Sequence, residues 1–184
     1  MPTWLIILLV VVVLLIVWLI SVYNGLVVLR NKVRDQFSQI DIQLKRRFDL
    51  IPNLVETVKG YAKHEEGTLE AVVKARNTYL SAGTPEDKLA ASGELTGALN
   101  KLFALSESYP DLKANTNFTD LQQQLKDTED KISYSRQFYN DAVLTYNNAV
   151  EVFPKNLIAN MFGFKKETFF QAAEEERKNV EVKF

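Results

Sequence analysis

The sequence predicts an all-α protein in which an N-terminal transmembrane helix continues into an elongated antiparallel four-helix bundle. Three observations support this fold class. Seventeen consecutive apolar residues extend from Trp4 to Ile20, apolar residues then recur at helical spacing, and no alternating strand pattern competes with them. The 184 residues are enough for one ordinary domain. We predict an anchor at 1–22, a helical bundle at 23–153, and an aromatic segment with a polar tail at 154–184.

The first element is the predicted anchor. As a helix, residues 3–22 would extend roughly 30 Å, the thickness of the hydrocarbon core of a bilayer. A cleavable signal peptide needs a positive N-terminal region, a shorter apolar core and a small-residue cleavage site, and this segment has none of them. We therefore expect an uncleaved anchor in contact with lipid. Aromatic rings near the two ends of a span favour the headgroup region, and the predicted interface anchors are Trp4, Trp18 and Tyr23.

The charges after the span predict its orientation. Six basic residues follow it, against two acidic ones: Arg30, Lys32, Arg34, Lys45, Arg46 and Arg47, against Asp35 and Asp41. The positive-inside rule then places the N-terminus outside and the bundle in the cytoplasm, with the protein in the cell membrane. The alternative is that these charges belong to a solvated helix face and say nothing about the orientation of the span.

The first bundle helix is predicted to continue from the anchor. Its apolar stripe advances in steps of three, four and four residues, which is close to the period of an undistorted α-helix: Leu26, Leu29, Val33, Phe37, Ile40, Leu44, Phe48, Ile51 and Val55. The helix would end near Lys63. Pro52 lies inside it, and the alternatives are a kink or a break with Asp49 as the new N-cap. Because the stripe continues past Pro52, the pattern favours the kink.

Two shorter helices are predicted next. Gly67 would end the first helix, and a second helix at 68–82 would bury one face, formed by Leu69, Val72, Val73 and Leu80. Thr84 as N-cap and Pro85 at the first helical position would begin a third helix that continues to about Ser108. Small residues on one face of that third helix predict close approach of a neighbouring helix, and they are Ala90, Gly93, Gly97 and Ala104.

The last long helix is predicted to begin with Thr119 as its cap. Two heptad columns, as in a coiled coil, mark its buried side: Leu125, Ile132, Tyr139, Tyr146 and Phe153, and Leu121, Thr128, Ser135, Ala142 and Ala149. Its tyrosine-lined face would pack in the core or, alternatively, line a ligand groove. If the four helices run up, down, up and down, this helix returns toward the membrane. If the second and third helices lie end to end as one arm, it points away.

Pro154 is predicted to stop this helix. The segment after it mixes aromatic and aliphatic side chains with lysines: Leu157, Ile158, Met161, Phe162, Phe164, Phe169 and Phe170, with Lys155, Lys165 and Lys166. This segment would either close the open end of the bundle or return to the membrane surface. The last eleven residues, at 174–184, would form a polar, frayed tail.

Composition excludes several function classes. A net charge of −1 argues against nucleic-acid binding, which normally requires a basic excess. The absence of cysteine and the single histidine, His64, exclude thiol catalysis and multi-histidine metal sites; His64 would instead interact with the last carbonyls of a helix. A di-iron carboxylate bundle needs paired Glu-x-x-His motifs, and none is present. We expect no enzyme, no catalytic residues, no metal and no cofactor.

One polar cluster remains as a candidate partner surface: Asp41, Lys45, Arg46, Arg47, Asp49 and Asn53. The alternative is a salt-bridged helix face with pairs at i,i+4 spacing. Lys45 would stand roughly 35 Å from the membrane on an upright helix, which favours a protein partner over lipid. The identity of the partner is open, and the sequence gives no indication of a homo-oligomer.

Three blocks of the sequence resemble the LemA family of bacterial membrane proteins. They are YNGLVVLRNKV after the span, QIDIQLKRRFDLIPNLVETVKGYAKHE at 39–65, and YNNAVEVFPKNLIANMFGF at 146–164. The resemblance covers nearly the whole chain and implies a single transmembrane helix followed by an antiparallel helical bundle. It implies no catalytic residues. Because the family includes a protein of the magnetosome membrane, the resemblance favours a scaffold or membrane-organising role.

Overall fold

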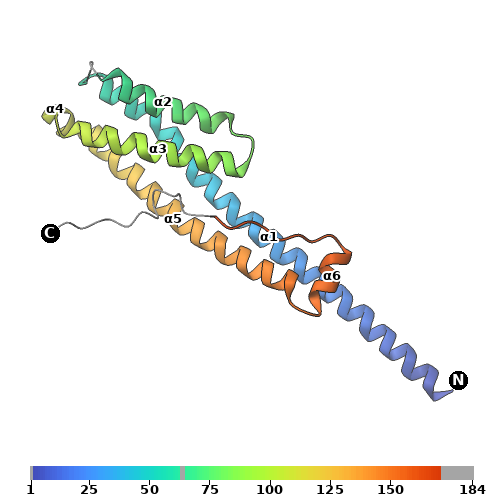
Figure 1. Cartoon of the computed structure of the whole chain (residues 1–184). Coiled ribbons are helices and arrows are strands. Elements are labelled where there is room, and N and C mark those ends of the chain that lie inside the picture. The colour runs from blue at the N-terminus through green and yellow to red at the C-terminus, as the bar shows by residue number, and fades with distance from the viewer. Residues whose placement is uncertain (1, 63–64, 171–184) are drawn as a thin grey trace, which may run out of the picture. The chain divides into compact units, whose positions relative to one another are not determined.

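The computed structural model describes residues 2–62 and 65–170 (Figure 1). These residues form six α-helices and no strand, which confirms the all-α prediction. They fall into two compact units. The anchor unit comprises residues 2–40 and 134–170, and the hairpin unit comprises 41–62 and 65–133. One described helix, α1, is long and apolar enough to cross a membrane, and this supports a single-pass membrane anchor.

Helix α1 extends from Thr3 to Lys59 without interruption. It continues through Pro52, so the helix has no break at Asp49, which was the alternative to the favoured kink. A proline removes one helical hydrogen bond, but the side chains on both sides of Pro52 are held by burial: Phe48, Ile51 and Leu54 are almost completely buried. Burial on the stripe therefore outweighs the local cost of the proline.

Helices α2 (Glu66–Ser81) and α3 (Pro85–Ser106) form an antiparallel hairpin in the hairpin unit (Figure 1). They lie side by side, which rules out the arrangement of one end-to-end arm. Gly67 does not end the first helix, because it lies in the first turn of α2. The buried face of α2 also differs from the prediction: Ala75 and Tyr79 join Leu69 and Val72 in it, whereas Val73 and Leu80 are exposed.

The start of α3 agrees with the prediction. The Thr84 side chain accepts a hydrogen bond from the Asp87 backbone N–H at 3.1 Å, and Pro85 takes the first helical position. The four small residues that were predicted to meet a neighbouring helix are all exposed: Ala90, Gly93, Gly97 and Ala104. A Cβ added at Gly93 or Gly97 would meet nothing within 4 Å. Other positions, two alanines among them, form the buried apolar face of α3: Ala91, Leu95, Ala98, Leu99 and Leu102.

The short helix α4 (Pro110–Lys113) precedes α5 (Thr116–Glu151). Asn115, not Thr119, is the residue at the start of α5 whose side chain accepts a backbone hydrogen bond, from Phe118 N–H at 3.1 Å. The heptad columns are largely confirmed: Leu125, Ile132, Tyr139 and Tyr146 are buried, as are Leu121, Thr128 and Ala142. Ser135 and Ala149 are half-buried. Phe153 is 73% exposed, because α5 ends before it.

Within the anchor unit, α5 runs antiparallel to α1. The Phe37 ring of α1 lies against the Tyr139 ring of α5. Nearer the N-terminus of α1, the Tyr23 ring contacts two rings that follow α5 in the chain, Phe162 and Phe164. The last long helix therefore returns toward the predicted membrane span. After α5 come the cis Phe153–Pro154 peptide bond, helix α6 (Lys155–Met161) and an extended segment that the structure describes to residue 170.

Candidate functional site

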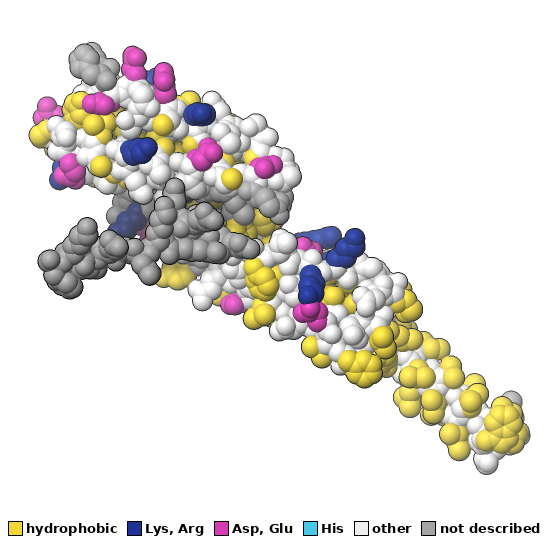
Figure 2. Space-filling model, in the orientation of Figure 1, with side chains coloured by type: hydrophobic (Ala, Val, Ile, Leu, Met, Phe, Trp, Pro, Cys, Tyr) yellow, Lys and Arg dark blue, Asp and Glu magenta, His cyan; other side chains and the backbone are white. Residues whose placement is uncertain are grey.

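Helix α1 changes its surroundings abruptly at Val22. From Trp4 to Ser21 all but one of the side chains are exposed, and Leu19 is half-buried. Val22 is the first buried side chain, and Leu26 and Val33 follow at helical spacing. The exposed part is apolar throughout (Figure 2). An uncovered apolar surface of this length is unfavourable in water and suits a bilayer.

An aromatic cluster lies at this boundary, where the packed part of α1 begins. The Tyr23 ring lies 4.9 Å from the Phe162 ring and 5.7 Å from the Phe164 ring, centroid to centroid, and both pairs meet edge to face. The Arg30 guanidinium lies 5.0 Å from the centroid of Phe164. Phe164 is buried, whereas Phe162 is 55% exposed. The cluster thus fixes the segment after α5 against α1 at the end of the predicted span.

The segment that leads from α5 to this cluster carries exposed apolar side chains. We call them the collar, and they are Val152, Phe153, Leu157, Met161 and Phe162, each between 55% and 73% exposed. Leu157 and Met161 are four residues apart and so share one face of α6, while Ile158 and Ala159 face inward. In Figure 2, hydrophobic side chains also appear on the end of the anchor unit that adjoins the bare helix. Such a contiguous apolar surface marks an interaction site more often than an isolated exposed leucine does.

Two asparagines of α5 hold the segment that follows the collar. Asn147 donates to the Glu167 carbonyl and accepts from the Glu167 N–H, both at 2.9 Å. Asn140 makes the same pair of bonds to Phe170, at 3.1 and 2.8 Å. Each side-chain amide thus pairs with both the N–H and the C=O of one residue, as the backbone of an adjacent β-strand would. Sequence reasoning missed both residues, although their seven-residue spacing beside Tyr139 and Tyr146 was the available signal.

The tyrosines of the predicted ligand face are part of this packing. Tyr139 is 8% exposed and lies between the rings of Phe37 and Phe170, and its hydroxyl donates to the Thr168 carbonyl at 3.1 Å. Tyr146 is 1% exposed. Burial, together with the nearby Glu167 carboxylate, raises the pKa of Tyr146, although Arg30 and Arg34 oppose the rise. Both rings therefore lie in the core of the anchor unit.

The predicted partner surface is divided by the structure. Arg47 is buried at 3% exposed, and its guanidinium donates from Nη1 to the Ser92 hydroxyl at 3.2 Å and from Nη2 to the Thr96 hydroxyl at 3.1 Å. Its Nη1 also lies 2.6 Å from a Glu129 carboxylate oxygen. Arg47 therefore joins α1 to α3 and α5 inside the hairpin unit. The available signal was its place three residues after Leu44 and four before Ile51, on the apolar stripe.

The remaining residues of that surface are more accessible. Lys45, Arg46, Asp49 and Asn53 are exposed, and Asp41 is half-buried. Asp41 pairs with Lys88 of α3, with 2.7 Å between Nζ and Oδ1, and among the described residues no ion pair joins Asp41 to Lys45. The surface that these residues offer to a partner thus consists of four exposed side chains on α1.

Asp41 also shapes the environment of Tyr79. The Tyr79 ring stacks on Phe48 with 3.9 Å between centroids, and its hydroxyl lies 3.5 Å from Asp41 Oδ1. Burial raises the pKa of Tyr79 to about 12, and the negative charge of Asp41 contributes to the rise. A neutral tyrosine and a charged lysine therefore share the Asp41 carboxylate at physiological pH.

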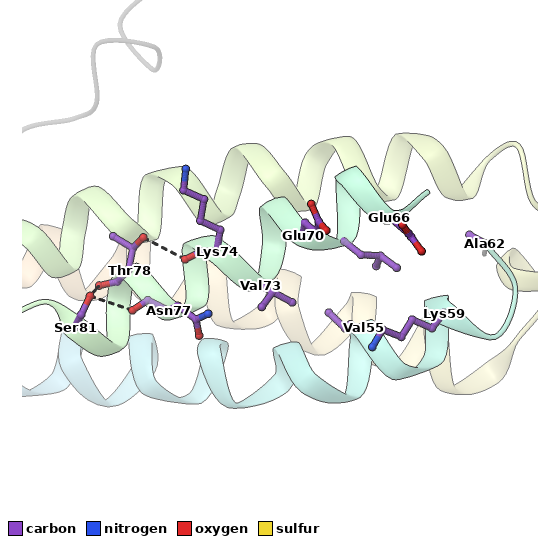
Figure 3. Close-up of a pocket in the computed structure, with 11 residues that line it drawn as sticks. Val55, Lys59, Ala62, Glu66, Glu70, Val73, Lys74, Asn77, Thr78 and Ser81 are labelled. Carbon is purple, nitrogen blue, oxygen red and sulfur yellow. Dashed lines mark hydrogen bonds between the residues drawn. The ribbon is translucent and has the colours of Figure 1, made fainter. Parts of the chain in front are cut away.

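A groove of about 1230 Å³ opens between the end of α1 and α2 in the hairpin unit (Figure 3). Val55 and Val73 face one another across it, and Asn77 points toward α1. Its rim carries charges of both signs, from Lys59, Glu66, Glu70 and Lys74. This lining suits a partly apolar, partly polar occupant and favours no single charge.

The described residues contain no group of three or more histidine, cysteine, aspartate or glutamate side chains that could hold a metal ion. His64 and the polar tail with Glu174, Glu175 and Glu176 lie outside the described residues. The predictions about them stay predictions. So do the interface roles of Trp4, Trp18 and Tyr23, which are 63%, 39% and 37% exposed on α1.

Known proteins resemble this chain over most of its length. Residues 36–184 match the model of the LemA family. The magnetosome protein MamQ 2 of Paramagnetospirillum magneticum is 25% identical over 175 residues, which cover 81% of this chain and 64% of the relative. MamQ of Magnetospirillum gryphiswaldense is 24% identical, with 80% and 64% covered. Protein LemA of Metamycoplasma hominis is 27% identical over 157 residues, with 83% and 70% covered.

The chain thus spans slightly less than two thirds of the length of its MamQ relatives. The names of the family and of these relatives denote no enzyme. The match extends from α1 into the hairpin unit and on through α5, α6 and the segment after them, so it includes both the Arg47 contacts and the collar. On this match, the chain belongs to the LemA family.

Proposed function

We propose that this protein is a non-enzymatic scaffold, tethered to the membrane by α1, that organises other proteins at the membrane surface. The observation that carries the proposal is the continuity of α1. One helix of 57 residues includes both the bare apolar span and the core of the bundle. The helix is continuous from the span to the first packed side chains, Val22 and Leu26, so the packed part of the anchor unit is joined to the span without a linker.

The relatives support the same kind of role. The MamQ proteins are named as magnetosome proteins, and a magnetosome is a membrane-bounded organelle. A scaffold needs a stable surface more than a reactive site. Tyr139, Tyr146 and Arg47 were the side chains that the sequence suggested for binding. All three pack inward, which is consistent with that requirement.

The proposal includes an orientation, with the N-terminus outside and the bundle in the cytoplasm. The basic residues after the span support it, and Arg30 and Lys32 stand about two to two and a half turns after Tyr23 on α1. Because the chain has no cysteine, single cysteines at Thr3 and Thr116 can be labelled with an impermeant thiol reagent in intact cells. We expect labelling at Thr3 and none at Thr116. The reverse pattern would overturn the cytoplasmic orientation.

The partner surface is proposed to be the exposed face of α1 formed by Lys45, Arg46, Asp49 and Asn53. Replacing Lys45 and Arg46 by glutamate reverses two charges without disturbing buried contacts, since both side chains are exposed. In proximity labelling, we expect neighbours of the wild-type protein to be lost from this variant. A matched control replaces Lys126 and Lys131, which are exposed on α5. If the two variants label the same neighbours, this face is not the partner surface.

A second candidate function is ligand sensing. The tyrosine-lined face of α5 is buried, so the groove between α1 and α2 is the more accessible location for a ligand. Val55→Trp would fill the groove near Val73. If the groove serves sensing, this variant loses ligand-dependent neighbours while keeping its membrane location and its helix content.

A further inference from the structure

The collar lies at the level where α1 leaves the predicted span. Phe37 and Tyr139 are in contact and fix the register of the antiparallel pair α1 and α5. Glu151, the last residue of α5, follows Tyr139 by twelve residues, and Gly25 precedes Phe37 by the same number. At 1.5 Å per residue, both stand about 18 Å from that contact, on the same side. Helix register therefore places the end of α5 near Gly25, two residues after Tyr23, and the collar begins at the next residue, Val152.

The ring contacts give the same result independently. Phe162, at the other end of the collar, lies 4.9 Å from Tyr23. The first buried residue of α1 is Val22, and the side chains before it are bare. The Tyr23–Phe162 contact therefore joins the end of the bare span to the collar.

Charge around the collar suits a membrane surface. Residues 24–35 and 151–167 together contain six basic side chains and three acidic ones, and the basic ones are Arg30, Lys32, Arg34, Lys155, Lys165 and Lys166. Glu151 forms an ion pair with Lys166. A basic excess beside exposed aromatic and aliphatic side chains is typical of segments that lie in the headgroup region of a bilayer that contains anionic lipids.

We infer that the collar inserts into the headgroup region of the same bilayer that α1 crosses, on the side of the bundle. This inference rests on the membrane anchoring in the proposed function. The α6 region thus makes a second membrane contact beside the helix axis. A single span can tilt and rotate freely, and a second contact restricts both movements. The collar would thereby give the scaffold a fixed face toward the membrane.

The test uses the full chain in nanodiscs that contain anionic lipid, with single cysteines carrying an environment-sensitive fluorophore. Phe153→Cys, Leu157→Cys and Met161→Cys probe the collar. Phe138→Cys is the matched control, because Phe138 is exposed to 60% on α5 and stands about 20 Å before the end of that helix at Glu151. Leu14→Cys, in the middle of the span, reports on the anchor itself.

We expect lipids that carry a spin label near the top of the acyl chain to quench the collar probes at least twofold more than the Phe138 probe. Blue-shifted emission without quenching would mean that protein covers the collar. Emission and quenching equal to those of the Phe138 probe would mean that the collar is exposed to water. Either result overturns the inference if lipids with a deep spin label still quench Leu14. If Leu14 is not quenched, the anchoring itself is wrong and the inference falls with it.

A charge substitution gives a second readout. Leu157→Glu and Met161→Glu place carboxylates on the exposed face of α6 and leave the inward residues Ile158 and Ala159 in place. In the double variant, we expect quenching of the Phe153 probe to fall to the level of Phe138 while quenching of Leu14 stays unchanged. Unchanged quenching at Phe153 would contradict insertion of the α6 face.

Discussion

The two units hold their segments together by different chemistry. In the hairpin unit, polar contacts cross between helices inside an otherwise apolar core: Arg47 joins Ser92, Thr96 and Glu129, and Asp41 pairs with Lys88. In the anchor unit, aromatic edges and two asparagines fix an extended segment on a pair of helices. Charges inside a core specify one arrangement of neighbours at a cost in desolvation, whereas rings and amides hold a segment that has no regular structure of its own.

The largest effect should come from removing the buried cation of the hairpin unit. Arg47→Ala deletes the hydrogen bonds to Ser92 and Thr96 and leaves Glu129 without this partner. We expect the free energy of unfolding to fall by about 3 kcal/mol, measured by urea titration with circular dichroism in a mild detergent. The control is Arg46→Ala, the exposed neighbour, which should stay within about 0.5 kcal/mol of wild type. Equal losses in the two variants would contradict the structural role of Arg47.

The second effect tests the amide contacts of the anchor unit. Asn147→Ala removes both bonds to the Glu167 backbone, and unsatisfied polar groups cost about 1–3 kcal/mol. We expect hydrogen exchange at the Glu167 amide to accelerate about tenfold or more, because 1.4 kcal/mol corresponds to a factor of ten. Asn148→Ala, at the exposed adjacent position, should leave this exchange unchanged. If both variants exchange alike, the segment is held by its rings and not by Asn147.

The third effect is the pH dependence that Tyr79 gives to the stability of the hairpin unit. Since the pKa of Tyr79 is raised to about 12 from its ordinary value of 10.0, the stability that the neutral phenol contributes is complete below pH 10. It is lost as the pH rises from about 10 through 12, because the unfolded chain ionises first. We expect a loss on the order of 1 kcal/mol, seen by comparing urea unfolding at pH 9 and about 11.5. Tyr79→Phe should lose less over that interval, whereas Tyr134→Phe, which removes an exposed ring hydroxyl, should behave as wild type.

The smallest effect compares one substitution in the two units. Gly97→Ala in α3 meets no atom within 4 Å, so better helix propensity should stabilise the protein by about 0.5–1 kcal/mol. Gly163→Ala should destabilise it by a similar amount, because Gly163 has a φ of +72°, which side chains other than glycine rarely adopt. The same measurement of urea unfolding gives both signs. A loss at Gly97 would indicate that a helix does approach this face.

The comparison also explains which elements could be read from the sequence. The unbroken apolar run and the stripe with an eleven-residue period predicted α1, and the heptad columns predicted α5. Long periodic segments are predicted well because they average over local exceptions. Thr84 and Pro85 predicted the start of α3, because capping is a local interaction. The end of α1 and the cap at Thr119 were wrong by about one turn, since several nearby residues offered equivalent signals. The bounds of α2 were wrong by one or two residues, and Gly67 lies inside α2 instead of ending α1.

The sequence by itself determined the order of the four longer helices and the position of the span, and it excluded thiol catalysis and multi-histidine metal sites. These follow from composition and period alone. Only the tertiary structure decided that Arg47 lies inside the bundle and that Val73, Leu80, Gly93 and Gly97 face outward. It also brought the residues after Pro154 to Tyr23. Each of these depends on a partner more than twenty residues away in the chain, and periodicity within one helix carries no information about which neighbour will cover which face.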